Sequence, residues 1–92
     1  MILQSCQKLV GEGPVVNETR TTSNFSGVQL KVPGNLLYAE GAAYKVELQS
    51  QQNILNEVET ILSGDDLIIR FRHANTNLRS GEDINVQITA PV

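Results

Sequence analysis

The sequence predicts an all-β domain, and three observations lead to that prediction. Short runs of alternating apolar and polar residues recur about every ten residues, as strands of a sandwich, barrel or solenoid do. Turn sequences rich in Gly, Pro, Asn and Asp separate these runs. Aromatic residues make up only 4% of the chain, so Val, Ile and Leu must fill the core. The pattern alone leaves three architectures open, a β-solenoid of stacked short strands, an antiparallel β-sandwich and a barrel.

The clearest local signal is a hairpin between residues 59 and 72. Residues 59–63 and 67–72 read as two strands, and Gly64-Asp65-Asp66 between them supplies the turn, since Gly accepts positive φ. Period-two alternation places one set of side chains inward, namely Leu67, Ile69 and Phe71. The outward set is Ile68, Arg70 and Arg72.

The remaining elements follow from the same pattern. Further strands are expected at residues 15–22, 28–32, 36–40, 43–49 and 84–89. Residues 53–57 suggest one helical turn with Asn53 as its cap. The polar segment 73–83 reads as an exposed loop.

Composition narrows the function classes. A chain of 92 residues forms one small domain with a thin core. Its net charge of −3 and its scattered Lys and Arg residues argue against a nucleic-acid partner. No apolar run reaches the roughly 18 residues that a membrane-spanning helix needs.

No residue pattern indicates catalysis. His73 is the only histidine, whereas a zinc site needs three or four ligands. Asp65-Asp66 suits a turn better than a calcium site, which needs about six to eight oxygens. Arg70 and Arg72 form at most a small basic stripe. We therefore expect no catalytic residue, no cofactor and no metal ligand.

Cys6 is the one cysteine and has a specific context. Leu3-Gln4-Ser5-Cys6 resembles a bacterial lipobox, in which the chain is cut before a cysteine that then carries lipid. The charged and apolar regions of a signal peptide do not precede it here. Residues 1–10 are therefore interpreted as the remnant of a lipoprotein signal plus a linker, and residues 11–92 as the β domain.

The ordered landmarks of the chain resemble the head GIN domain family of bacterial auto-transporter adhesins. They are Val15-Val16-Asn17-Glu18-Thr19-Arg20, Phe25-Ser26-Gly27-Val28, Tyr44-Lys45-Val46-Glu47-Leu48, Asn53-Ile54-Leu55, Gly64-Asp65-Asp66-Leu67-Ile68-Ile69 and Ile84-Asn85-Val86-Gln87-Ile88. The resemblance covers residues 11–91 and corresponds to the N-terminal half of the domain, incomplete at its C-terminus. It implies an exported protein, often a lipoprotein, with a right-handed β-helix-like fold and no established catalytic residues.

These observations predict a non-enzymatic, adhesin-like binding or structural module. We expect it in the periplasm or at the outer membrane or cell surface, held to the membrane only by lipid on Cys6. The expected ligand is a cell-surface glycan or protein. A polysaccharide-active β-helix enzyme and a self-associating structural subunit are the alternatives. We also expect a homodimer through the last strand, from Ile84 to Thr89, because an uncovered terminal coil invites pairing.

Overall fold

In the computed structural model, the structure describes residues 7–22, 24–79 and 83–91. These residues form nine β-strands and one short α-helix, which confirms the all-β class. The elements are β1 (Gln7–Leu9), β2 (Val15–Arg20), β3 (Gly27–Leu30), β4 (Gly34–Glu40), β5 (Lys45–Gln51), α1 (Gln52–Leu55), β6 (Val58–Ser63), β7 (Asp66–Phe71), β8 (Thr76–Leu78) and β9 (Ile84–Ala90).

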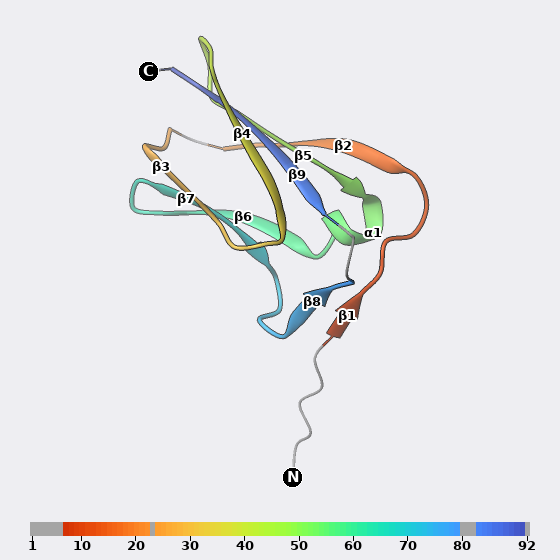
Figure 1. The fold of residues 1–92 in the computed structure, drawn as a ribbon. Coiled ribbons are helices and arrows are strands. Elements are labelled where there is room, and N and C mark those ends of the chain that lie inside the picture. The colour runs from red at the N-terminus through yellow and green to blue at the C-terminus, as the bar shows by residue number, and fades with distance from the viewer. Residues whose placement is uncertain (1–6, 23, 80–82, 92) are drawn as a thin grey trace.

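The strands form three sheets (Figure 1). A four-stranded sheet has the order β2-β5-β9-β4, a three-stranded sheet the order β3-β7-β6, and β1 pairs with β8. The pairs β3–β7, β4–β9 and β1–β8 are parallel, and the pairs β2–β5, β5–β9 and β6–β7 are antiparallel. Both larger sheets are therefore mixed. The solenoid and the sandwich both stay predictions.

The core lies between the inner faces of the two larger sheets. In β5 and β9 every second side chain is buried, because one face of the sheet packs on the core and the other faces solvent. Helix α1 adds Ile54 and Leu55 to the same cluster. The buried cluster is completed by Leu9, Phe25, Val32, Val46, Leu48, Val58, Leu67, Ile69, Ile84, Val86, Ile88 and Ala90. Apart from Ser50, which is 2% exposed, the polar residues of β5 and β9 are thereby directed to the outer surface.

The predicted hairpin is present as β6 and β7, within one residue of its expected bounds. Leu67 and Ile69 are 1% and 0% exposed, as the alternation predicts. Ile68 belongs to the set predicted to face outward, but it is only 9% exposed. Ile68 lies outside the main core cluster, on the outer side of the sheet.

Two short strands lie where the sequence predicts none. Strand β8 occupies part of the predicted loop 73–83, and β1 occupies part of the predicted linker 1–10. The two pair in parallel, from Gln7 opposite Thr76 to Leu9 opposite Leu78. Three residues are too few to show a period, so only the partner strand identifies each of them.

Asn53 is not the cap of α1, contrary to the sequence prediction. The helix begins one residue earlier, its N-cap is Gln51, and no side chain bonds at that cap. The Asn53 side chain instead accepts a hydrogen bond from the Glu12 amide (2.9 Å) and donates one to the Val10 carbonyl (2.7 Å). Asn53 thus ties the segment between β1 and β2 to the helix.

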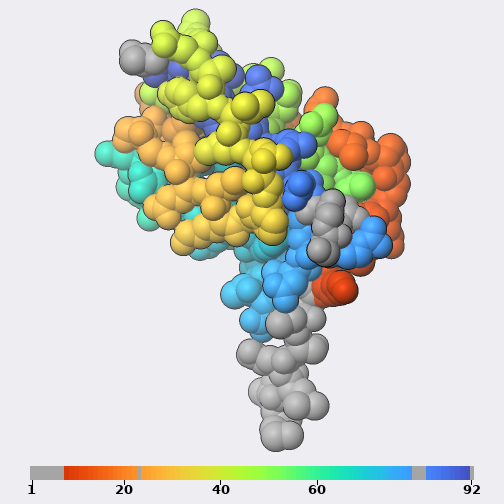
Figure 2. Space-filling view, in the orientation of Figure 1, coloured from red at the N-terminus to blue at the C-terminus, as the bar shows by residue number. Residues whose placement is uncertain are grey.

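Strand β4 is the exposed edge of the four-stranded sheet. All seven of its residues are exposed, including Leu37 at 68% and Tyr38 at 56%. Figure 2 shows β4 in yellow, running uncovered across this face. Strand β9, by contrast, is paired on both sides, with β5 and β4. The homodimer through Ile84 to Thr89 stays a prediction, but the edge strands of this sheet are β2 and β4 rather than β9.

Candidate functional site

The outer face of the four-stranded sheet carries a row of carboxamide side chains. Register places Asn17 of β2 opposite Gln49 of β5, Gln49 opposite Asn85 of β9, and Asn85 opposite Asn35 of β4. Facing residues on paired strands project to the same side of a sheet. The four side chains, here called the amide row, therefore cross the whole sheet in one line, and all four are exposed.

A second row of side chains lies beside the amide row on the same face of the sheet, and the two rows together line a hollow. Glu47 of β5 lies opposite Gln87 of β9, which lies opposite Leu37 of β4. These three residues and the amide row line a shallow hollow of about 420 Å³. We call this surface the amide face. Glu47 is partly neutralised, because its carboxylate lies 3.8 Å from the Lys45 ammonium.

The chemistry of the amide face is hydrogen bonding without strong charge. Each carboxamide offers two N–H donors and one carbonyl acceptor. The Asn35 Nδ2 donates to Asn85 Oδ1 at 3.0 Å, which orients both amides. The rows follow the strand spacing of about 4.8 Å, so donors and acceptors recur at regular intervals. Such a surface suits a neutral ligand that carries many hydroxyl groups.

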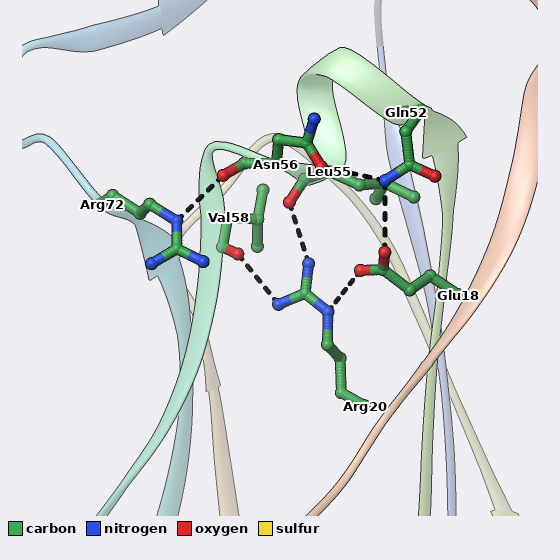
Figure 3. Close-up of polar contacts among 7 residues, drawn as sticks. All are labelled: Glu18, Arg20, Gln52, Leu55, Asn56, Val58 and Arg72. Atoms are coloured by element: carbon green, nitrogen blue, oxygen red, sulfur yellow. Dashed lines mark hydrogen bonds and ion pairs between the residues drawn. The ribbon is translucent and has the colours of Figure 1, made fainter.

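A second polar cluster stabilises the fold rather than offering a binding surface (Figure 3). Arg20 of β2, whose side chain is only 16% exposed, extends toward the end of α1. Its Nη2 donates to the Leu55 carbonyl (2.8 Å) and its Nη1 to the Val58 carbonyl (2.9 Å). Its Nε pairs with Glu18 at 2.5 Å. Arg20 thus binds the carbonyl of Leu55, which ends α1, and the carbonyl of Val58, which begins β6.

Glu18 completes this cluster. Burial raises the pKa of Glu18, but hydrogen bonds from Gln52 and Arg20 and the charge of Arg20 lower it, and the net pKa lies below its usual value. The carboxylate is therefore held ionised beside the guanidinium. Through Arg20 and Gln52, Glu18 links β2 to helix α1.

The residues that the sequence singled out lie apart from the amide face. Cys6 is outside the described residues. His73 is exposed in the turn after β7, and Asp65 and Asp66 lie at the hairpin turn, as expected. In the described part of the chain, no group of three or more His, Cys, Asp or Glu side chains could hold a metal ion.

The amide face itself escaped the sequence analysis. Its residues occupy the outward positions of four strands, where any polar side chain fits. The one clue in the sequence was the residue type. Asn and Gln occupy exposed strand positions at which Lys and Glu would be equally compatible with the fold. Only the pairing register aligns them in one row.

A comparison with protein families assigns residues 24–92 to "Putative auto-transporter adhesin, head GIN domain". The chain belongs to the head GIN domain family. The resemblance inferred from the spaced landmarks is thereby confirmed. A comparison with curated proteins gives no match.

Solved structures share the fold of this head GIN domain at low sequence identity. A putative adhesin from Bacteroides fragilis is 13% identical, with a TM-score of 0.78 over 91% of this chain and 39% of that one. A putative adhesin from Parabacteroides merdae is 14% identical, with a TM-score of 0.74 over 91% and 35%. A putative lipid-binding protein from Parabacteroides distasonis is 14% identical, with a TM-score of 0.75 over 91% and 37%. The chain thus spans less than two fifths of each structure.

Among the described residues of this head GIN domain, no helix is long and apolar enough to cross a membrane.

Proposed function

We propose that this head GIN domain is a non-enzymatic, adhesin-like module that binds neutral glycans through its amide face. The amide row carries the proposal, because four carboxamides from four strands line up across an exposed surface. The family description and the adhesins of similar fold support the same class of function.

The ligand class follows from the hydrogen-bonding groups. Sugar hydroxyls both donate and accept, and so do carboxamides, so each side chain can bond a hydroxyl in either sense. Leu37, which is 68% exposed at the edge of the hollow, offers an apolar surface for the C–H face of a sugar ring. The single carboxylate, Glu47, is paired with Lys45 and adds little net charge.

Binding of dextran and mannan oligosaccharides, followed by isothermal titration calorimetry, tests this function. We expect saturable binding to at least one of them by the wild-type domain. The variants Gln49→Ala and Asn85→Ala should each weaken that binding about tenfold, because removal of one or two hydrogen bonds changes the binding free energy by about 1.4 kcal/mol. Both residues are exposed, so the fold should persist.

Gln29→Ala is the matched control. Gln29 is also an exposed strand glutamine, but it lies on β3 in the other sheet, where it donates to Asp66. Its replacement should leave the affinity within about twofold. Equal weakening by Gln29→Ala and Asn85→Ala, or no binding of either oligosaccharide, would refute the assignment of this face.

We also propose that the protein is exported and anchored at the cell envelope by lipid on Cys6. The lipobox-like sequence ending at Cys6 supports this, as does the surface role of adhesins. Metabolic labelling with a fatty-acid analogue, in cells that express the protein with its natural upstream sequence, should mark the wild type. Cys6→Ala should remain unlabelled. Label retained in that variant would exclude lipidation at this position.

We infer, finally, that the parallel pairs β3–β7 and β4–β9 are stacked turns of a solenoid-like fold. Long connections separate the two strands of each pair, and each pair is in continuous register. Replacement of Gly34, which lies against the Ile84 backbone, tests how closely β4 and β9 pack.

A further inference from the structure

A second hollow, of about 480 Å³, lies where the three-stranded sheet ends beside β8. Three segments line it, namely residues 31–33, 70–74 and 76–78. Figure 2 shows the gold segment after β3 next to the blue segment of β8. Its lining includes Lys31, Arg70, Arg72 and His73 and no acidic residue. We call it the basic groove.

The fold gathers these cations from separate parts of the chain. The Lys31 amide donates to the Ile69 carbonyl at 2.8 Å, which extends the parallel register by one residue and sets Lys31 beside Arg70. Arg70 lies in β7 and Arg72 in the bend directly after it, and both side chains reach the same carboxylate, that of Glu59. Three of the seven Lys and Arg residues thus meet in one groove of a chain whose net charge is −3.

Glu59 orients the arginines without cancelling the charge. It lies 2.9 Å from Arg70 Nε and 3.9 Å from Arg72 Nη1, and it does not line the groove. Arg72 Nε also donates to the Asn56 carbonyl at 2.9 Å. Both arginine side chains remain about half exposed, at 47% and 52%. With Lys31 counted and His73 neutral, the groove and Glu59 together carry a charge of about +2.

Thr76 is the most buried polar residue among those that line the groove. Thr76 lines the groove and is only 6% exposed, and its hydroxyl has no hydrogen-bond partner among the described atoms. Because that hydroxyl oxygen is itself buried, the exposed cations of the groove rather than Thr76 supply the hydrogen-bond donors of the groove. Pro33, Phe71 and Leu78 supply apolar walls.

We propose that the basic groove binds a phosphate monoester carried by a small organic group. A phosphomonoester has a charge of about −1.5 to −2 at neutral pH and three acceptor oxygens, which matches the groove charge and its N–H donors. The apolar walls contact the organic part. The hollow has the size of a small-molecule site, of about 300–1,000 Å³, rather than the extended basic stripe that nucleic acid requires.

Titration of the ¹⁵N-labelled domain with glucose 1-phosphate, followed by NMR, tests the site. We expect saturable shifts confined to residues 31–33 and 70–78. Arg70→Gln and Lys31→Gln should each weaken binding about tenfold or more, since each removes a charge-assisted contact. Lys45→Gln removes the same charge from the other sheet and should change the affinity by less than about twofold. Equal weakening by Lys45→Gln, or shifts that do not saturate, would overturn the proposal.

Binding to lipid vesicles distinguishes a phosphate monoester on a lipid from one on a soluble molecule. Vesicles of phosphatidylcholine with phosphatidic acid carry the same monoester on a lipid. Binding to these vesicles but not to pure phosphatidylcholine, lost in Arg70→Gln, supports the site with a lipid as the source. Retention of vesicle binding by Arg70→Gln, without binding of glucose 1-phosphate to the wild type, would refute it. The groove and the amide face lie on different sheets, so failure here leaves the glycan proposal standing.

Discussion

Gly34→Ala is expected to destabilise the domain more than the matched change Gly64→Ala does. Gly34 begins β4 with φ of +151°, a backbone region that is almost restricted to glycine. A Cβ there would overlap the Ile84 carbonyl oxygen and lie 2.7 Å from its carbon. The backbone strain costs about 1–3 kcal/mol. The overlap adds about 1–3 kcal/mol, because β4 and β9 must move apart.

Urea denaturation followed by circular dichroism measures this loss. Gly64→Ala is the matched control, since Gly64 also has positive φ (+62°) but nothing lies within 4 Å of its added Cβ. It should lose only the left-handed strain, about 1–2 kcal/mol. Equal midpoints for the two variants would mean that residue 34 does not approach Ile84 so closely.

The same change should affect the amide face. Asn35 and Leu37 of β4 form one wall of that surface, and parallel pairing with β9 holds them there. Glycan binding by Gly34→Ala should therefore fall even under conditions where the rest of the domain remains folded.

Alternation of apolar and polar residues predicted correctly those strands that have one buried face and one solvent-exposed face. Val46, Leu48, Ile84, Val86 and Ile88 are all buried, because period-two patterning determines their facing once the strand exists. Strand β4 was predicted from the same alternation, but neither of its faces is buried. It lies at the edge of the sheet, where both of its faces meet solvent.

The pairing of distant strands was not predictable from local sequence. Parallel partners such as β3 and β7 are separated by three other strands in the chain. The sequence of neither segment indicates which strand it pairs with. Both candidate sites depend on that pairing. The amide row needs four strands in register, and the basic groove needs Lys31 beside Arg70. The sequence contained the side chains, whereas the topology decides which of them meet.

The Arg20 cluster shows a related limit. Arg20 is a charged residue on the inward face of β2, opposite the buried Val46 of β5, and its guanidinium bonds carbonyl groups of Leu55 and Val58. Leu55 is the last residue of α1, so its carbonyl has no partner within the helix, and Val58 is the first residue of β6. The need for a donor becomes visible only when the helix end and β2 are seen together (Figure 3).

Ile69→Ala should cost about 2–5 kcal/mol of unfolding free energy, through lost transfer energy and the cavity left behind. Ile69 lies at the centre of the three-stranded sheet, paired with Leu30 on one side and Thr60 on the other, and is 0% exposed. For a domain of this size the melting temperature should fall by about 8 °C or more.

Arg70→Ala provides the comparison, because it alters the next residue of the same strand on the opposite face. Its side chain is 47% exposed and its ion pair with Glu59 is partly solvated, so the loss should be about 0.2–1 kcal/mol. Chemical denaturation of both variants gives the order directly. A larger loss for Arg70→Ala would mean that β7 is displaced by one residue, which would exchange its two faces. Arg70 would then point into the core, and the basic groove could not exist as described.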